Sequence, residues 1–223
     1  MTIPPGFKDQ QLKFDRVKSA YEEKETAVKD LLKTQNAKGE YELFLRAFKK
    51  EKDLELWIKP KGATSYSLLT TYPFCTSSGT LGPKRKEGDL QIPEGVYHIN
   101  HFNPFSTFHL SLGINYPNAS DKILGDKKSP GGAIYIHGNC VSIGCIPITD
   151  EKIKELYVLA VESKNNGQSA IPVHIFPTRL DVVDETDPIN ASFWRNLKTI
   201  YDDFEKTKKL RPVSVDKAGA YNF

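Results

Sequence analysis

The stretch that most constrains this sequence is Ala133–Asp150, which reads AIYIHGNCVSIGCIPITD. Its first five residues are largely apolar and predict a strand that ends in a histidine. A short polar loop follows, and a Gly-Cys pair then stands just ahead of a predicted helix. Thr149 or Asp150 can cap that helix, which ends near Gly167. The stretch therefore predicts a histidine and a cysteine within reach of each other, between a strand and a helix.

The residue types in this stretch suit nucleophilic catalysis by a thiol. A cysteine attacks as its thiolate, so it needs a nearby base, and His137 lies eight residues before Cys145. Gly144 allows the backbone to approach a substrate carbonyl closely. The amide N–H groups around Gly144 and Cys145 can then face a developing oxyanion, while Ser142 binds substrate or holds the loop. We interpret Cys145 as the candidate nucleophile and His137 as its base.

Two other interpretations fit the same residues. In the first, Cys145 is a small core residue and His137 is a structural histidine at a strand end. In the second, His137, Cys140 and Cys145 bind zinc, with His109 as a possible fourth ligand. The spacing His-x2-Cys-x4-Cys matches no common zinc finger, so the pattern itself does not favour this site.

The rest of the chain predicts a mostly β fold with flanking helices. Residues 10–32 carry apolar side chains at helical spacing, and residues 193–204 carry a second such stripe before Pro212. Between them, short β-rich runs are separated by Gly and Pro. We predict strands at residues 42–48, 54–59, 66–72, 96–99, 107–112, 133–137 and 171–176, the first two forming a hairpin. The pattern indicates a compact, mostly antiparallel β domain.

Composition and element order suggest three parts and exclude some functions. The predicted parts are an N-terminal helical segment (1–38), a catalytic domain (39–180) and a C-terminal helical extension (181–223). The net charge of +3 is too small to indicate nucleic-acid binding. No apolar run is long enough to cross a bilayer. Residues 1–5 lack the basic start and apolar stretch of a signal peptide.

Three segments together resemble one enzyme family. The pattern HGxxxSxGC, from His137 to Cys145, is similar to the active-site signature of L,D-transpeptidase catalytic domains of the YkuD type. Residues 88–97, GDLQIPEGVY, resemble a second segment of that family. The block at residues 108–121 narrows the resemblance to the YafK-like branch of murein L,D-transpeptidases. The likeness covers about residues 43–177.

The resemblance implies a compact β-sandwich catalytic domain with packing helices at both ends. It implies acyl transfer on peptidoglycan stem peptides, in which Cys145 attacks the carbonyl of an L-centre and His137 accepts the thiol proton. It also places Gly138, His109 and Tyr116 beside the substrate. No cofactor or metal is expected for this chemistry. Asp89, in the second segment, is expected to be a structural turn residue.

Departures from the family pattern leave substrate recognition open. Ile143 replaces the usual histidine before Gly-Cys, and the usual Arg or Asn after Cys145 is replaced by Ile146. The thioester can pass to an amine, as in a transpeptidase. Passing it to water would make the chain a carboxypeptidase, or an amidase that releases wall-attached protein. A further alternative is a wall-binding module whose catalytic machinery has decayed.

The resemblance also bears on location and on the remaining cysteines. It implies a periplasmic or otherwise extracytoplasmic protein, whose export signal this sequence does not show. Stem peptides are the expected partners, together with a wall-attached protein in the hydrolase alternative; the oligomeric state is not predicted. The three cysteines cannot all pair with one another. In an oxidising compartment, a Cys75–Cys140 bridge would leave Cys145 free.

Overall fold

The computed structural model describes residues 6–37 and 39–223; residues 1–5 and the predicted boundary at Lys38 lie outside the described residues. The described helices are α1 (Phe7–Gln11), α2 (Asp15–Lys33), α3 (Ala119–Leu124), α4 (Thr149–Asn165) and α5 (Ala191–Thr207). The described strands are β1 (Tyr41–Phe48), β2 (Asp53–Pro60), β3 (Ser67–Pro73), β4 (Gly95–Asn103), β5 (Ser111–Ile114), β6 (Tyr135–His137), β7 (Ile146–Pro147), β8 (Ile171–Phe176), β9 (Ser214–Val215) and β10 (Tyr221–Asn222).

Eight of these strands form one mixed sheet in the order β3-β2-β1-β8-β4-β5-β6-β7, and β9 pairs with β10 separately. Strands β1 and β2 pair antiparallel from Tyr41↔Pro60 to Phe48↔Asp53, which confirms the predicted hairpin. Strand β8 runs parallel to β1 and antiparallel to β4. It therefore joins the hairpin to the half of the sheet that contains the His-Gly-Cys stretch. Strands β6 and β7, on either side of the polar loop, pair in parallel.

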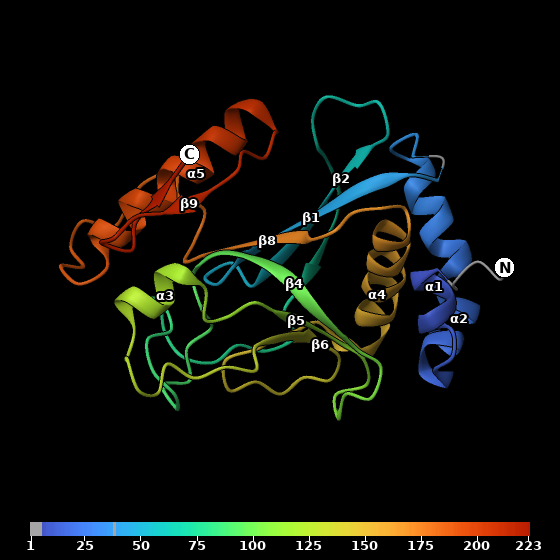
Figure 1. Ribbon diagram of the computed structural model, residues 1–223, viewed down its shortest axis with the longest axis horizontal. Coiled ribbons are helices and arrows are strands. Elements are labelled where there is room, and N and C mark those ends of the chain that lie inside the picture. The colour runs from blue at the N-terminus through green and yellow to red at the C-terminus, as the bar shows by residue number, and fades with distance from the viewer. Residues whose placement is uncertain (1–5, 38) are drawn as a thin grey trace, which may run out of the picture.

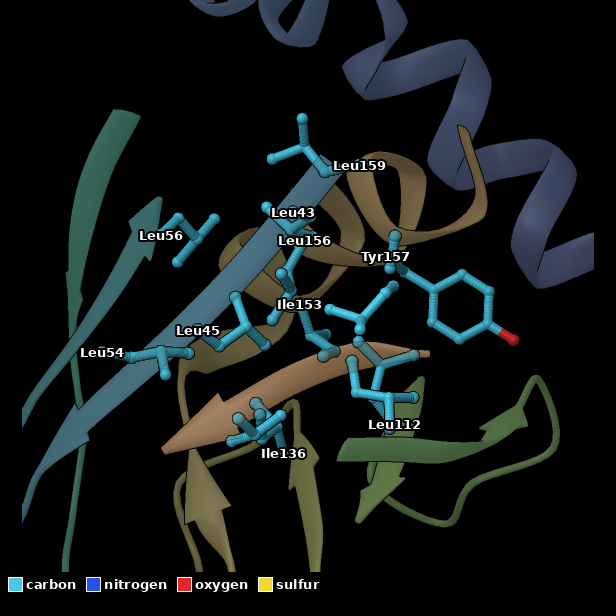
Figure 2. Packing of buried hydrophobic residues seen from close by; sticks show 14 of the residues in the cluster. Leu43, Leu45, Leu54, Leu56, Leu112, Ile136, Ile153, Leu156, Tyr157 and Leu159 are labelled. Atoms are coloured by element: carbon cyan, nitrogen blue, oxygen red, sulfur yellow. The ribbon is translucent and has the colours of Figure 1, made fainter. Parts of the chain in front are cut away.

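Helix α4 lies against one face of the sheet, and α2 covers the outer side of α4 (Figure 1). Figure 2 shows the resulting core, in which Leu43 and Leu45 of β1 meet Ile153 and Leu156 of α4. All four side chains are fully buried. Burial of each such side chain contributes about 1.5–3 kcal/mol. This core fixes α4, and with it the end of the loop that carries Cys145.

Helix α5 packs on alternate residues of the same strand. Successive side chains of β1 point to opposite faces, so Phe44 and Phe48 face away from Leu43 and Leu45. They form aromatic clusters with residues of β8 and α5, including Phe176, Trp194, Tyr201 and Phe204. In Figure 1, α5 lies at the opposite end of the molecule from α1 and α2. Both faces of β1 are therefore covered, which accounts for its continuous buried run.

The predicted fold class, mostly β with flanking helices, is confirmed, with the expected sandwich built from one continuous curled sheet. The predicted helix at residues 10–32 is divided into α1 and α2 by a turn at residues 12–14. The strand predicted at 107–112 is wrong at its start, because residues 104–110 form turns and β5 begins at Ser111. Helix α3 and strand β7 were not anticipated. Among the described residues, no helix is both long and apolar enough to span a membrane.

Candidate active site

A cavity of about 440 Å³ opens beside β6 and contains the two residues singled out from the sequence. It is enclosed by the β4–β5 connection, by the segment leading through β6, and by the loop between β6 and β7. The lining residues are Asn103, Ser106, Thr107, Phe108, Ser111, Ala133, Tyr135, His137, Val141, Ser142, Ile143 and Cys145. The structure thus brings His137, Ser142 and Cys145 to one concave site, the setting expected of a binding or catalytic pocket.

His137 is held in one orientation and one tautomer. It ends β6, pairs with Ser111 of β5, and has a buried side chain. Its Nδ1 lies 2.5 Å from the Gly138 carbonyl oxygen, which can only accept a hydrogen bond. Nδ1 therefore carries the hydrogen, and Nε2 is left as the basic nitrogen. The Phe108 ring stacks on the imidazole at 4.7 Å, and burial lowers the pKa of His137 below its ordinary value. The ring is accordingly neutral at neutral pH.

Cys145 is a free, half-buried thiol in the same cavity. Its Sγ accepts a hydrogen bond from the Tyr135 amide at 3.4 Å and lies 3.8 Å from the Ala133 carbonyl oxygen, to which the thiol can donate. Burial raises the pKa of the Cys145 thiol, although the Tyr135 amide and the Lys84 ammonium act in the opposite direction. The resting thiol is therefore protonated, and its reaction as a nucleophile requires a base.

The loop before Cys145 is held by its own serine. Ser142 Oγ donates to the Cys145 carbonyl at 2.8 Å and accepts from the Gly144 amide at 3.2 Å. Gly144 has a φ of +132°, and a Cβ there would lie 3.0 Å from the Gln91 carbonyl oxygen. Both the backbone conformation and the close contact therefore favour glycine at this position. The Gly144 amide is engaged inside the loop and does not face an oxyanion in this conformation. Of the two roles expected for Ser142, the contacts support holding the loop.

The same loop is tethered by a disulfide bond. Cys75, just after β3, is bonded to Cys140, with Cα atoms 5.4 Å apart. The Cys75 amide also donates to the Pro147 carbonyl at 3.0 Å, and Ser78 Oγ lies 3.3 Å from Ser142 Oγ. The bridge removes Cys140 from the zinc set of His137, Cys140 and Cys145. Within residues 6–37 and 39–223, no group of three or more candidate ligands is clustered for a metal ion.

Residues 50–175 match the family model of the L,D-transpeptidase catalytic domain, YkuD. The chain belongs to the L,D-transpeptidase (YkuD) family. It is 36% identical over 178 residues to YafK of Escherichia coli (strain K12), whose name gives it as a candidate L,D-transpeptidase; the match covers 78% of this chain and 70% of YafK. YafK of Escherichia coli O157:H7 gives the same values. The resemblance drawn from the sequence is confirmed.

A solved structure supports the fold assignment. The helical cell shape determining protein Pgp2 (K307A mutant) of Campylobacter jejuni superposes with a TM-score of 0.50 at 20% identity. The superposition covers 79% of this chain but 63% of that chain, so this chain spans less than two thirds of that protein. At this identity the likeness concerns the fold alone.

Three residues that the resemblance placed beside substrate do not line the cavity. A Cβ on Gly138 would lie 2.5 Å from Asp150 Oδ1 and 2.9 Å from the Phe108 carbonyl oxygen, so this glycine of the L,D-transpeptidase motif serves close packing. His109 has a φ of +70°, and its Nε2 is buried without a hydrogen-bond partner among the described residues. Tyr116 is buried and donates its hydroxyl hydrogen to the Pro130 carbonyl at 2.8 Å.

The β4–β5 connection supplies a wall of the cavity that sequence reasoning missed. Its residues Ser106, Thr107 and Phe108 were assigned to a strand or left without a role. The signal was local, because Asn103 Oδ1 accepts from the Phe105 amide and Ser106 Oγ accepts from the Phe108 amide, as Asn and Ser do in turns. At the opposite wall, Ile143 and Val141 are 79% and 49% exposed, which gives the mouth an apolar rim.

The second family segment has a structural role, as predicted for Asp89. Its carboxylate accepts from the Arg85, Lys86 and Gln91 amides at 2.8, 3.0 and 3.1 Å, and from Lys84 Nζ at 2.6 Å. These hydrogen bonds lower the pKa of Asp89 despite its partial burial. The prediction of a turn residue is confirmed. The turn also places the Gln91 carbonyl against Gly144, so it contacts the loop that carries Cys145.

Proposed function

We propose that this protein is a cysteine-dependent acyltransferase of peptidoglycan stem peptides, with Cys145 as nucleophile and His137 as base. Membership of the L,D-transpeptidase family supports an enzyme that acts on peptidoglycan. The observation that supports the mechanism is the Nδ1 contact of His137 with the Gly138 carbonyl, which leaves Nε2 basic in the cavity that also contains Cys145. A neutral base in the same cavity as a protonated thiol is an arrangement that suits nucleophilic catalysis.

The chemistry follows from the two protonation states. His137 Nε2 removes the Cys145 thiol proton as Sγ attacks the carbonyl carbon of the stem peptide. The tetrahedral intermediate collapses when His137 returns that proton to the leaving amine, and a thioester on Cys145 remains. An acceptor amine then forms a new amide, or water releases the acid. The lowered pKa of His137 and the raised pKa of Cys145 both favour the neutral resting pair over an ion pair.

The oxyanion of the intermediate needs hydrogen-bond donors near Sγ. Because the Gly144 amide is engaged by Ser142, we assign this role to the Cys145 amide, whose position depends on the hydrogen bond from Ser142 Oγ to the Cys145 carbonyl. The φ of +132° at Gly144 turns the backbone just before this amide. Ser142 and Gly144 therefore contribute by fixing the loop rather than by touching the substrate.

The disulfide supports an extracytoplasmic location for the reaction. Bridges such as Cys75–Cys140 persist in oxidising compartments and are rare where thiols are kept reduced. Peptidoglycan lies in such a compartment. The proposed location and the proposed substrate therefore agree.

The decisive experiment is mass spectrometry of muropeptides after purified sacculi are incubated with the wild type or with Cys145→Ala. Substitution of the nucleophile should reduce product formation at least about a thousandfold, with the melting temperature little changed. New cross-linked or amine-exchanged species in the wild-type reaction would show transpeptidation, whereas shortened stems or released wall-attached protein would show hydrolysis. Identical profiles for the two proteins would overturn the proposal and favour a wall-binding module.

A further inference from the structure

The N-terminal helix α2 makes a polar contact with the cavity wall. Arg16, on the first turn of α2, donates from one guanidinium nitrogen, Nη1, to the carbonyl oxygens of Ser106 (2.5 Å) and His109 (2.7 Å). These two carbonyls bracket Thr107 and Phe108, both of which line the cavity. One side chain therefore binds the first and the last carbonyl of the tetrapeptide 106–109. Arg16 precedes these two residues in the sequence by 90 and 93 positions.

The bracketed tetrapeptide leads directly to the proposed base. The Phe108 ring stacks on the His137 imidazole, with centroids 4.7 Å apart and planes 29° apart. The Phe108 carbonyl oxygen packs closely against Gly138, and it would lie 2.9 Å from a Cβ added there. The Gly138 carbonyl in turn fixes the His137 tautomer. A shift of the tetrapeptide would therefore move both the ring that shields His137 and the peptide that orients it.

Aromatic contacts hold the helix against the same connection. Phe14, just before α2, meets Phe105 edge to face at 4.9 Å, and Phe7 of α1 meets Phe102 of β4 at 5.0 Å. Ring pairs of this kind fix the position of the β4–β5 connection less tightly than a guanidinium that donates to two of its carbonyls. His109 has a φ of +70°, a conformation that a non-glycine residue keeps when its surroundings impose it. The hydrogen bond from Arg16 to the His109 carbonyl is one such restraint.

We propose that Arg16 is a positioning residue of the active site, which holds the tetrapeptide 106–109 so that Phe108 stays stacked on His137. The N-terminal helix then takes part in catalysis rather than only packing against the domain. The inference rests on the proposed function in one respect, because it treats His137 as the base. Its structural part, the dependence of the His137 environment on Arg16, stands separately and is tested separately.

The first measurement is the NMR titration of the histidines in the wild type, Arg16→Gln, Arg16→Lys and Lys18→Ala. Lys18 is a matched control, since it is exposed on the same helix and pairs with Asp15 within its own turn. Loss of the Arg16 contact should let water reach the His137 ring, so its pKa should rise in Arg16→Gln, while His174, which packs against Phe44 and Phe176, is unaffected. Arg16→Lys should restore part of the wild-type value, and Lys18→Ala should match the wild type.

The second measurement is the rate of Cys145 alkylation by iodoacetamide in the same proteins. We expect Arg16→Gln to slow alkylation by about tenfold, as a displaced base would. An unchanged pKa of His137 in Arg16→Gln would overturn the inference. A similar change in the pKa of every histidine, together with a lowered melting temperature, would also overturn it, because that result indicates a purely structural role for Arg16. If substitution of His137 leaves the alkylation rate of Cys145 unchanged, the proposed function fails, while the titration still decides the role of Arg16.

Discussion

Two regions of the molecule treat charge in opposite ways. On the side of β1 that faces α5, the chain buries Arg46, and at the end of that strand it buries Lys49, each beside a carboxylate. At the cavity beside β6, the lining residues are neutral amides, hydroxyls and apolar groups, together with His137 and the thiol. The first region contains full charges that never react, whereas the second lacks lysine, arginine and carboxylate side chains in its lining.

The buried charge of Lys49 is compensated atom by atom. Lys49 Nζ donates to the Gly82 and Ile92 carbonyls at 2.6 and 2.9 Å and to Glu94 Oε1 at 2.9 Å. Glu94 Oε2 accepts from Trp194 Nε1 of α5 at 2.8 Å. Three donors of one ammonium thus meet three acceptors, the condition under which a buried ion is tolerated. This network ties the turn that supports the Cys145 loop to the body of the sheet.

The difference shows where this fold can accept a new charge. In the network every charge has its partner before any ligand arrives. In the cavity, under the proposed mechanism, charge appears only when the thiol is deprotonated and the carbonyl becomes an oxyanion, so the surrounding dipoles act on the reacting atoms and not on resident ions. Three substitutions break or sharpen this contrast.

The largest effect is expected from His137→Gln, which keeps a polar group in the cavity but removes the base. The rate on sacculi should fall by about 10²- to 10⁴-fold, and alkylation of Cys145 near neutral pH should slow in parallel. Muropeptide analysis and iodoacetamide labelling measure the two effects. His101→Gln is the matched control, because His101 is exposed on β4 and outside the cavity. Full labelling of His137→Gln at the wild-type rate would refute the assignment of the base.

Lys49→Met tests the other side of the comparison. Removing one partner leaves the Glu94 carboxylate buried without its cation, which should lower the free energy of unfolding by about 3–5 kcal/mol. Urea denaturation followed by circular dichroism measures the loss. Lys50→Met, at the exposed neighbouring position, should leave stability nearly unchanged. A cost below about 1 kcal/mol would mean that the network does not support the fold as described.

The third effect, which is the smallest when expressed per pH unit, comes from adding a proton to the charged region. Burial, and then the Arg46 cation, lower the pKa of His174 from 6.5 to about 3. Between these values the unfolded chain binds a proton that the folded chain does not, so His174 makes stability fall as pH falls. The slope should reach about 1.4 kcal/mol per pH unit within this window. Denaturation from pH 4 to pH 7 in the wild type and His174→Leu measures it; parallel pH curves would contradict the prediction.

The sequence was sufficient where a pattern is local. The β1–β2 hairpin, strand β8 and helix α4 follow from the period of apolar residues, and the packing of Ile153 and Leu156 follows with them. The shared cavity of His137 and Cys145 follows from one short loop. These features depend on neighbours within a few residues, so residue type and spacing predict them.

What the sequence did not predict depends on distant partners. The parallel pairing of β1 with β8 joins residues such as Leu45 and Val173, and no periodicity states which strands will be adjacent. The contact of Arg16 with the β4–β5 connection is equally non-local. Tyr116 was placed beside substrate by resemblance, yet its hydroxyl is used by the Pro130 carbonyl. A motif identifies which residue types occur, and tertiary packing decides where each side chain lies.

The Cys75–Cys140 bridge also determines the oxidation chemistry open to the proposed nucleophile. The chain has three cysteines, so a bond between Cys75 and Cys140 leaves Cys145 with no thiol of its own chain to pair with. The alternative pairings would block the sulfur that is to attack the substrate. Under the proposed function and location, correct oxidation during folding is therefore what leaves the nucleophile as a usable thiol.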